Sequence, residues 1–174
     1  MVEAILFFAG SVLIIWISIP SLRHPGSHGF FRCFAWEIIL GMLLINVRGW
    51  FFHPFAWFQI ISWILLFASL VPLIAGVTLL RHAGKPTDAL EATTQLVSTG
   101  IYRFIRHPLY ASLLLLAWGI FFKSPALLDG CLCAVATTFL YATARADEDE
   151  CMVKFGVLYS DYMKKTRMFI PFFF

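Results

Sequence analysis

The chain has 174 residues, of which 60% are hydrophobic and only 13% are charged, and its formal net charge is +3. A soluble domain carries about 25% charged and about 45–50% apolar residues, so this composition excludes a soluble globular domain, a disordered chain and a nucleic-acid-binding module. Apolar runs of about 20 residues, the length of a membrane-spanning helix, recur along the chain. The sequence therefore predicts an all-α, multi-pass integral membrane protein with a single domain over residues 1–174.

Five apolar segments predict five transmembrane helices. In chain order they are 3–20, 30–52, 55–80, 108–122 and 126–144. The first is expected to be a retained helix, because the residues before it lack the basic region of a secretory signal. The first three helices form an N-terminal part, 1–80, and we assign cofactor binding and catalysis to 81–174.

Basic residues lie mostly on one side of a five-helix chain. The first loop, the third loop and the tail carry eleven Lys and Arg residues, whereas the other side carries two, Arg48 and Lys123. Cytoplasmic loops are enriched in Lys and Arg. We therefore expect the N-terminus outside, the C-terminus in the cytoplasm and any site on this basic side to face the cytoplasm.

The fourth segment is too short to cross the membrane alone. Its fifteen residues span roughly 22 Å, against about 30 Å for the hydrocarbon core. The turn before it should lie below the membrane surface, in a recess lined by protein. Seven acidic residues lie on the same predicted cytoplasmic side as the basic residues: Asp88, Glu91, Asp147, Glu148, Asp149, Glu150 and Asp161. A surface rich in both charges is either a solvated rim or a polar site, and we favour a polar site.

That turn, 100–110, reads GIYRFIRHPLY. Pro108 suits the first position of a helix, and it biases His107 away from helical geometry. The helix start directs free N–H groups and a positive dipole end into the recess, which attracts carboxylate or phosphate. If the preceding residues are helical, Tyr102 and Arg106 lie one turn apart on one face. Together these features favour a zwitterionic, ring-bearing cofactor.

A run of four acids, 147–150, follows Arg145 at the end of the fifth segment. Adjacent carboxylates repel one another, and the helix dipole disfavours them at a helix C-terminus. One interpretation is a solvated polar cap. The other is a set of hydrogen-bond acceptors for a cation or for ribose and amine groups, with the nearby basic loop offsetting the repulsion.

Glu37 and the cysteines give weaker signals. Glu37 lies inside the second segment, and an ionisable residue at that depth is a functional candidate. It is either a substrate contact or a buried, protonated or hydrogen-bonded side chain. The four cysteines form no CxxC pair, and no His–Cys cluster has zinc-site spacing, so we expect buried free thiols and no metal site.

Two motifs resemble those of a known family. LVSTGIYRFIRHPLY, residues 96–110, is similar to the signature of integral-membrane methyltransferases, namely the isoprenylcysteine carboxyl methyltransferases and the phospholipid N-methyltransferases. The tail has a matching second motif of an acidic pair, FG, two tyrosines and IP: Asp147-Glu148, Phe155-Gly156, Tyr159, Tyr162 and Ile170-Pro171. The resemblance covers about residues 81–171, and the first acid is Asp where the family usually has Glu.

The resemblance implies S-adenosylmethionine as methyl donor, bound at the cytoplasmic face, and a lipid or lipidated acceptor such as a prenylcysteine carboxylate or a phospholipid amine. Positions matching the family's cofactor-binding segments are Gln95, Leu96, Val97, Ser98, Gly100, Tyr102, Arg106, His107, Pro108, Leu109, Asp147 and Glu148.

The catalytic candidates are Arg106, His107 and Glu148. An amine acceptor must lose a proton, which His107 or Glu148 would take. The substrate-contacting arginine of the family falls at Thr143, two residues before Arg145. The candidate substrate contacts are Arg145, Glu37 and Tyr110.

Two other functions fit part of the sequence. Residues 146–174 also resemble the C-terminus of NADPH-dependent sterol and steroid reductases, including Cys151, but the counterpart turn in those enzymes ends in Asn-Tyr instead of Leu109-Tyr110. A non-enzymatic membrane scaffold with a basic face for anionic lipid explains the charge bias but neither motif. We favour methyl transfer, with the membrane and its lipids as partners and no nucleic acid.

Overall fold

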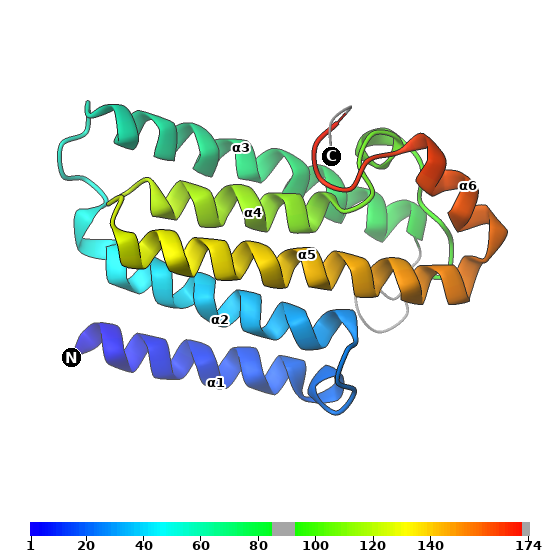
Figure 1. Ribbon diagram of the computed structural model, residues 1–174, viewed down its shortest axis with the longest axis horizontal. Coiled ribbons are helices and arrows are strands. Elements are labelled where there is room, and N and C mark those ends of the chain that lie inside the picture. Colours follow the sequence, from blue (N-terminus) through cyan, green and yellow to red (C-terminus); the bar gives the residue numbers. More distant parts are fainter. Residues whose placement is uncertain (85–92, 172–174) are drawn as a thin grey trace.

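The computed structural model of the chain describes residues 1–84 and 93–171, and in these ranges it is helical with no named strand. Its long helices lie side by side (Figure 1): α1 (Val2–Leu22), α2 (His28–Asn46), α3 (Trp57–Leu79), α4 (Pro108–Phe121) and α5 (Leu127–Phe155). The shorter elements are η1 (Val47–Gly49), a π-helical turn η2 (Leu80–Gly84), η3 (Gly100–Arg103) and α6 (Val157–Lys165). The all-α prediction is confirmed.

Four helices in the described ranges are long and apolar enough to cross a membrane: α1, α2 with η1, α3 with η2, and α5. Helix α4 is also apolar but has only 14 residues, about 21 Å of helix. The multi-pass architecture agrees with the prediction. The fifth crossing and the orientation of the termini stay predictions.

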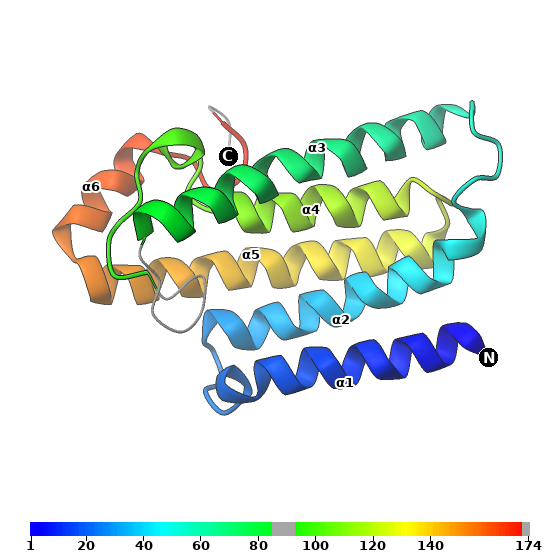
Figure 2. The ribbon, with the colours of Figure 1, turned by 180° about the vertical axis from the view of Figure 1, so that it is seen from behind.

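The helices pack as a row in an order that differs from the chain order. Helix α1 packs on α2, α2 on α5, α5 on α4, and α4 on α3, as the view from behind also shows (Figure 2). Small side chains in this row are completely buried, among them Ala35, Ala117 and Ala136. Small residues let helix backbones approach closely, which is how helices associate in lipid. The row thereby brings α4 and α5 together, and both carry predicted site residues.

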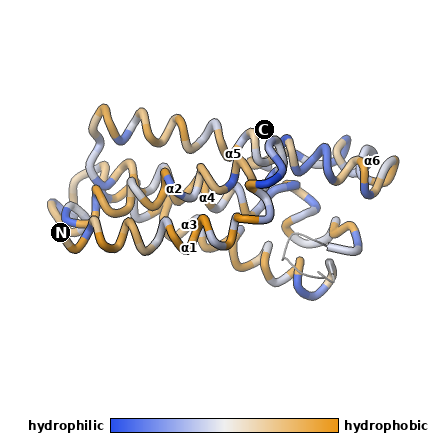
Figure 3. The backbone as a smooth tube through the Cα atoms, turned by 90° about the horizontal axis from the view of Figure 1, so that it is seen from below, coloured by the Kyte–Doolittle hydropathy of each residue, from blue (hydrophilic) through white to orange (hydrophobic). Residues whose placement is uncertain are grey.

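Helix α5 is longer than the apolar segment that predicts it. The helix continues through the acidic run to Phe155 and ends at Gly156, whose φ is +56°. The acids therefore lie inside a helix, and the expected position at a helix C-terminus is wrong. Figure 3 shows that hydrophilic residues are concentrated at this end of the molecule, around α6.

A separate group of polar contacts lies at the other end of the helix bundle, away from α6. Lys123, between α4 and α5, is buried, and its Nζ donates to Gln59 Oε1 at 3.1 Å and lies 3.5 Å from the ring centre of Trp63. The Gln59 amide donates in turn to the carbonyls of Gly49 and Lys123, each at 3.1 Å. These contacts fix the loops far from α6.

Candidate active site

The turn before α4 is held by the C-terminal segment of the chain. Arg106 N donates to Arg167 O at 2.7 Å, His107 N donates to Met168 O at 3.2 Å, and Arg167 N donates to Phe104 O at 3.0 Å. A buried backbone donor without a partner is unfavourable. The pairing supplies these partners and holds the side chains of Arg106 and His107 at the start of α4.

Local geometry at the start of α4 matches the sequence prediction. Pro108 occupies the first turn of the helix, and His107 caps it with φ −121° and ψ 64°, outside helical geometry. Gly100, which opens the turn, has φ +57°, and a Cβ there would lie 2.6 Å from Leu79 Cδ1. Glycine is therefore favoured at position 100 for its backbone conformation, and it lies close to the Leu79 side chain of α3.

Arg106 and Glu148 form a buried ion pair. Arg106 Nε and Nη2 lie 2.8 Å and 2.7 Å from Glu148 Oε1, and Arg145 Nη1 lies 3.1 Å from Oε2. Arg106 Nη1 also donates to the carbonyls of Thr166 and Met163 at 2.7 Å and 3.3 Å. Arg106 therefore joins the start of α4 to α5, through Glu148, and to the end of α6.

His107 lies between two carboxylates. Its Nδ1 is 3.3 Å from Asp147 Oδ2, and its Nε2 is 3.4 Å from Glu148 Oε1. Burial alone would lower the pKa of His107, but hydrogen bonds to Asp147 and Glu148 and the charges of both carboxylates outweigh it, so the pKa is raised. The two flanking carboxylates thus favour the protonated, imidazolium form of His107.

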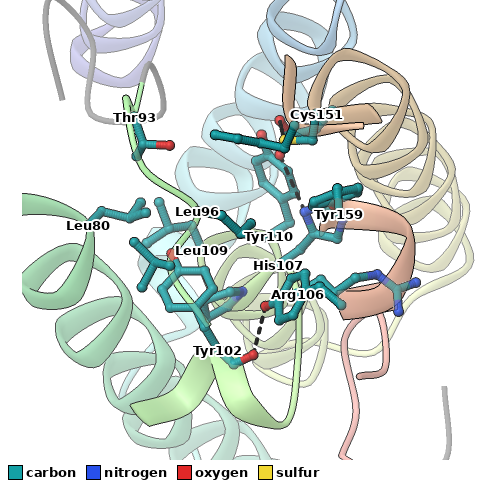
Figure 4. A pocket seen from close by; sticks show the side chains of 15 residues that line it. Leu80, Thr93, Leu96, Tyr102, Arg106, His107, Leu109, Tyr110, Cys151 and Tyr159 are labelled. Carbon is teal, nitrogen blue, oxygen red and sulfur yellow. Dashed lines mark hydrogen bonds and ion pairs between the residues drawn. The ribbon is translucent and has the colours of Figure 1, made fainter. Parts of the chain in front are cut away.

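A cavity opens between this turn, α5 and α6 (Figure 4). Its lining combines charged, aromatic and apolar side chains, namely Leu80, Thr93, Leu96, Val97, Tyr102, Arg106, His107, Pro108, Leu109, Tyr110, Asp147, Cys151, Phe155, Tyr159 and Tyr162. The Tyr110 ring stacks on the His107 ring with 5.4 Å between centres. Tyr162 Oη donates to the carbonyl of Tyr102 at 2.7 Å, which ties α6 to η3.

The cavity brings together nine of the predicted site residues. They are Leu96, Val97, Tyr102, Arg106, His107, Pro108, Leu109, Tyr110 and Asp147. Gln95, Ser98 and Gly100 are outside its lining, although Gly100 opens the turn and the other two shortly precede it. Glu148 lies behind it, in the ion pair with Arg106.

The other two predicted substrate contacts lie elsewhere. Arg145 is outside the cavity lining and pairs with Glu148, with its side chain 53% exposed. Glu37, in the middle of α2, accepts a hydrogen bond from Ser11 Oγ of α1 at 2.7 Å. Glu37 lines a different groove, between α1, α2 and Leu132. Its observed role is to connect α1 to α2.

Six lining residues were not among the predicted contacts: Leu80, Thr93, Cys151, Phe155, Tyr159 and Tyr162. Three of them, Phe155, Tyr159 and Tyr162, belong to the tail motif, so the motif itself was the signal. Cys151 follows Asp147 by four residues, which places both on one face of a helix. Leu80 and Thr93 had no sequence signal.

Comparisons with known proteins agree with this geometry. A family model described as phospholipid methyltransferase matches residues 57–160, more than half of the chain. The chain is also 27% identical over 154 residues to Methanethiol S-methyltransferase 2 of Bradyrhizobium diazoefficiens, an alignment that covers 77% of this chain and 58% of the relative. No solved structure matches the chain. By the extent of the family match, the chain belongs to the phospholipid methyltransferase family of integral-membrane proteins.

Proposed function

We propose that the protein transfers a methyl group from S-adenosylmethionine to an acceptor that enters from the membrane. The observation that carries this proposal is the cavity in which the His107–Asp147 pair, the start of α4 and a set of aromatic rings meet. The family match supports methyl transfer as the reaction. The resemblance of the turn and tail motifs supports S-adenosylmethionine as the donor.

The lining residues fit the chemical groups of this donor. Tyr102, Phe155 and Tyr159 offer rings to the adenine, and the Asp147 carboxylate offers an acceptor to the ammonium group or the ribose hydroxyls. The positive end of α4 would hold the donor's carboxylate. Burial raises the pKa of Tyr102 and Tyr159, so both stay neutral hydrogen-bond donors.

The cavity must widen to hold the whole donor. Its volume is about 80 Å³, whereas pockets for ligands of this size have about 300–1,000 Å³. Binding should therefore be accompanied by a displacement of the walls. Helix α6 is one of these walls, and the Tyr162–Tyr102 hydrogen bond holds it to η3.

A second, apolar groove is lined by α3, α4, α5 and the C-terminal segment. Ala111 and Trp118 of α4, Tyr141 of α5 and Phe169 line it. The ring centre of Phe169 is also 6.2 Å from that of His107. An acceptor with an apolar body would lie in this groove with its reactive group at His107.

Two acceptor classes are consistent with this route. The family resemblance favours a lipid or lipidated acceptor, such as a phospholipid amine or a prenylcysteine carboxylate. The relative's name, Methanethiol S-methyltransferase 2, favours a thiol. In either case the sulfonium is an activated methyl donor. The protein would then contribute to catalysis by aligning the two reactants and excluding water.

Titration of the purified protein with S-adenosylhomocysteine tests the donor. We expect binding to wild type and a roughly ten- to hundred-fold weaker affinity for Asp147→Asn, because a charged hydrogen-bond acceptor is lost. Asp149→Asn is the matched control, since Asp149 is exposed on the same helix. Binding of NADPH instead of S-adenosylhomocysteine would overturn the proposal in favour of a reductase.

The transfer itself is measured with radiolabelled S-adenosylmethionine. The acceptors to compare are phosphatidylethanolamine vesicles, a prenylated cysteine and an alkyl thiol. Label should appear in at least one product with wild type and Asp149→Asn. Absence of label from every acceptor, in protein that binds S-adenosylhomocysteine, would exclude these acceptor classes.

A further inference from the structure

Two rings at the start of α4 are stacked on each other. The ring centres of His107 and Tyr110 lie 5.4 Å apart, with 21° between the ring planes. The two residues are three positions apart, so they lie on one face of the first helical turn. Both are buried, and both line the cavity, as Figure 4 shows. The start of α4 therefore presents an imidazole nitrogen and a hydroxyl side by side.

Both of these polar groups contact Asp147 of α5. His107 Nδ1 lies 3.3 Å from Asp147 Oδ2, and the Tyr110 hydroxyl is hydrogen-bonded to the same carboxylate. The protonated form of His107 keeps Asp147 ionised, because opposite charges in contact stabilise each other. An ionised carboxylate can only accept hydrogen bonds, so the hydroxyl of Tyr110 is the donor.

The Asp147 carboxylate keeps acceptor positions for a ligand. A carboxylate has about four such positions, and His107 and Tyr110 each use one of them. The Asp147 side chain lines the cavity and is 21% exposed. The contacts with the start of α4 therefore hold the carboxylate while its other lone pairs stay available in the cavity.

A single hydrogen bond does not fix the orientation of this carboxylate. Asp147 can rotate about its Cβ–Cγ bond, and the contact with His107 holds one oxygen. The hydroxyl of Tyr110 adds a second donor, whose position relative to the first is set by the stacked rings. Cys151 Sγ, 3.9 Å from Asp147 Oδ1, is only a weak donor. The orientation of Asp147 therefore depends on Tyr110 as well as on His107.

We propose that Tyr110 is a positioning residue, which holds the Asp147 carboxylate in the orientation that binds the methyl donor. This inference rests on the proposed function, in which Asp147 accepts hydrogen bonds from the donor's ammonium group or ribose hydroxyls. Binding groups are effective when neighbouring side chains lock their orientation. The role differs from the direct contact with the acceptor that the sequence predicts for Tyr110, and the two roles have different consequences in a Tyr110→Phe variant.

A double-mutant cycle with S-adenosylhomocysteine tests this role. Tyr110→Phe keeps the ring and its stack on His107 and removes only the hydroxyl, so we expect affinity to fall about three- to ten-fold. In an Asp147→Ala background the same change should have less than about a two-fold effect, because the carboxylate that the hydroxyl orients is absent. Asp149→Ala is the matched background, since Asp149 is exposed on the same helix, and there Tyr110→Phe should have its full effect.

Steady-state kinetics separate positioning from a contact with the acceptor. With any acceptor that wild type labels among phosphatidylethanolamine, a prenylated cysteine and an alkyl thiol, Tyr110→Phe should raise KM for S-adenosylmethionine about three- to ten-fold. KM for the acceptor should stay within about two-fold of wild type. A raised KM for the acceptor with unchanged affinity for S-adenosylhomocysteine would overturn the proposal. Additive losses in the cycle would overturn it too, because a packing role of Tyr110 does not depend on the carboxylate.

The same cycle measured by denaturant unfolding without ligand reports the contact itself and the folding of each variant. We expect Tyr110→Phe to destabilise wild type more than it destabilises Asp147→Ala. If wild type binds no S-adenosylhomocysteine, the proposed function fails, and the positioning role fails with it. If wild type binds S-adenosylhomocysteine but either cycle is additive, the proposed function stands and the positioning role of Tyr110 is wrong.

Discussion

Arg106 and Glu148 are joined at 2.7 Å in an ion pair whose side chains are 10% and 2% exposed. Arg106 belongs to the turn before α4 and Glu148 to the polar end of α5, so the pair joins two motifs that are 42 residues apart. The same guanidinium holds two backbone carbonyls around the end of α6. A single arginine thus connects three of the walls of the cavity.

Arg106→Ala should destabilise the protein as well as weaken cofactor binding. Removing one partner of a buried pair leaves an uncompensated charge, here on Glu148, and typically costs about 3–5 kcal/mol. We expect a loss of this order in denaturant unfolding of the detergent-solubilised protein.

Lys164→Ala provides a matched control. Lys164 pairs with Asp161 at 2.8 Å, but both side chains are more than half exposed, and exposed pairs contribute about 0–1 kcal/mol. Equal stability losses in Arg106→Ala and Lys164→Ala would show that the Arg106–Glu148 pair is not buried in the folded protein.

His107 should make the stability of the protein depend on pH. Its pKa is raised in the folded state by Asp147 and Glu148, whereas an unfolded histidine has a pKa of about 6.5. The stabilisation is therefore complete below pH 6.5 and is lost as the pH rises through the folded-state pKa. We expect the difference in unfolding free energy between wild type and His107→Gln to be largest at pH 6 and to shrink at alkaline pH.

His24→Gln is the control for this measurement, because His24 is exposed in the loop between α1 and α2. Its stability curve should follow that of wild type. A His107→Gln difference that grew toward alkaline pH would mean that His107 is neutral in the folded state.

Topology is testable with single cysteines in a cysteine-free background. His24 and Ser124 are exposed in loops at opposite ends of the bundle. We expect His24→Cys to react with an impermeant reagent only from the cytoplasmic side and Ser124→Cys only from outside. Reaction of both from the same side would show that the row of helices does not cross the membrane as the charge bias predicts.

Local features of this protein were determined by the sequence alone. Pro108 and His107 set the start of α4 because proline fixes its own backbone and restricts the residue before it. The membrane helices follow from apolar segments long enough to span a bilayer. Asp147 and Cys151 share a face because helix geometry repeats every 3.6 residues. Each of these properties depends on residues that are close in the chain.

Only the tertiary structure determined which neighbours each acid of the run 147–150 contacts. Asp147 faces the cavity and His107, Glu148 is buried against Arg106, and Glu150 binds His28 of α2. Successive residues of a helix point about 100° apart, so adjacent acids reach different neighbours. Those neighbours come from α2, the turn before α4 and the C-terminal segment. Their positions depend on the packing order of the helices, which no local pattern of apolar residues encodes.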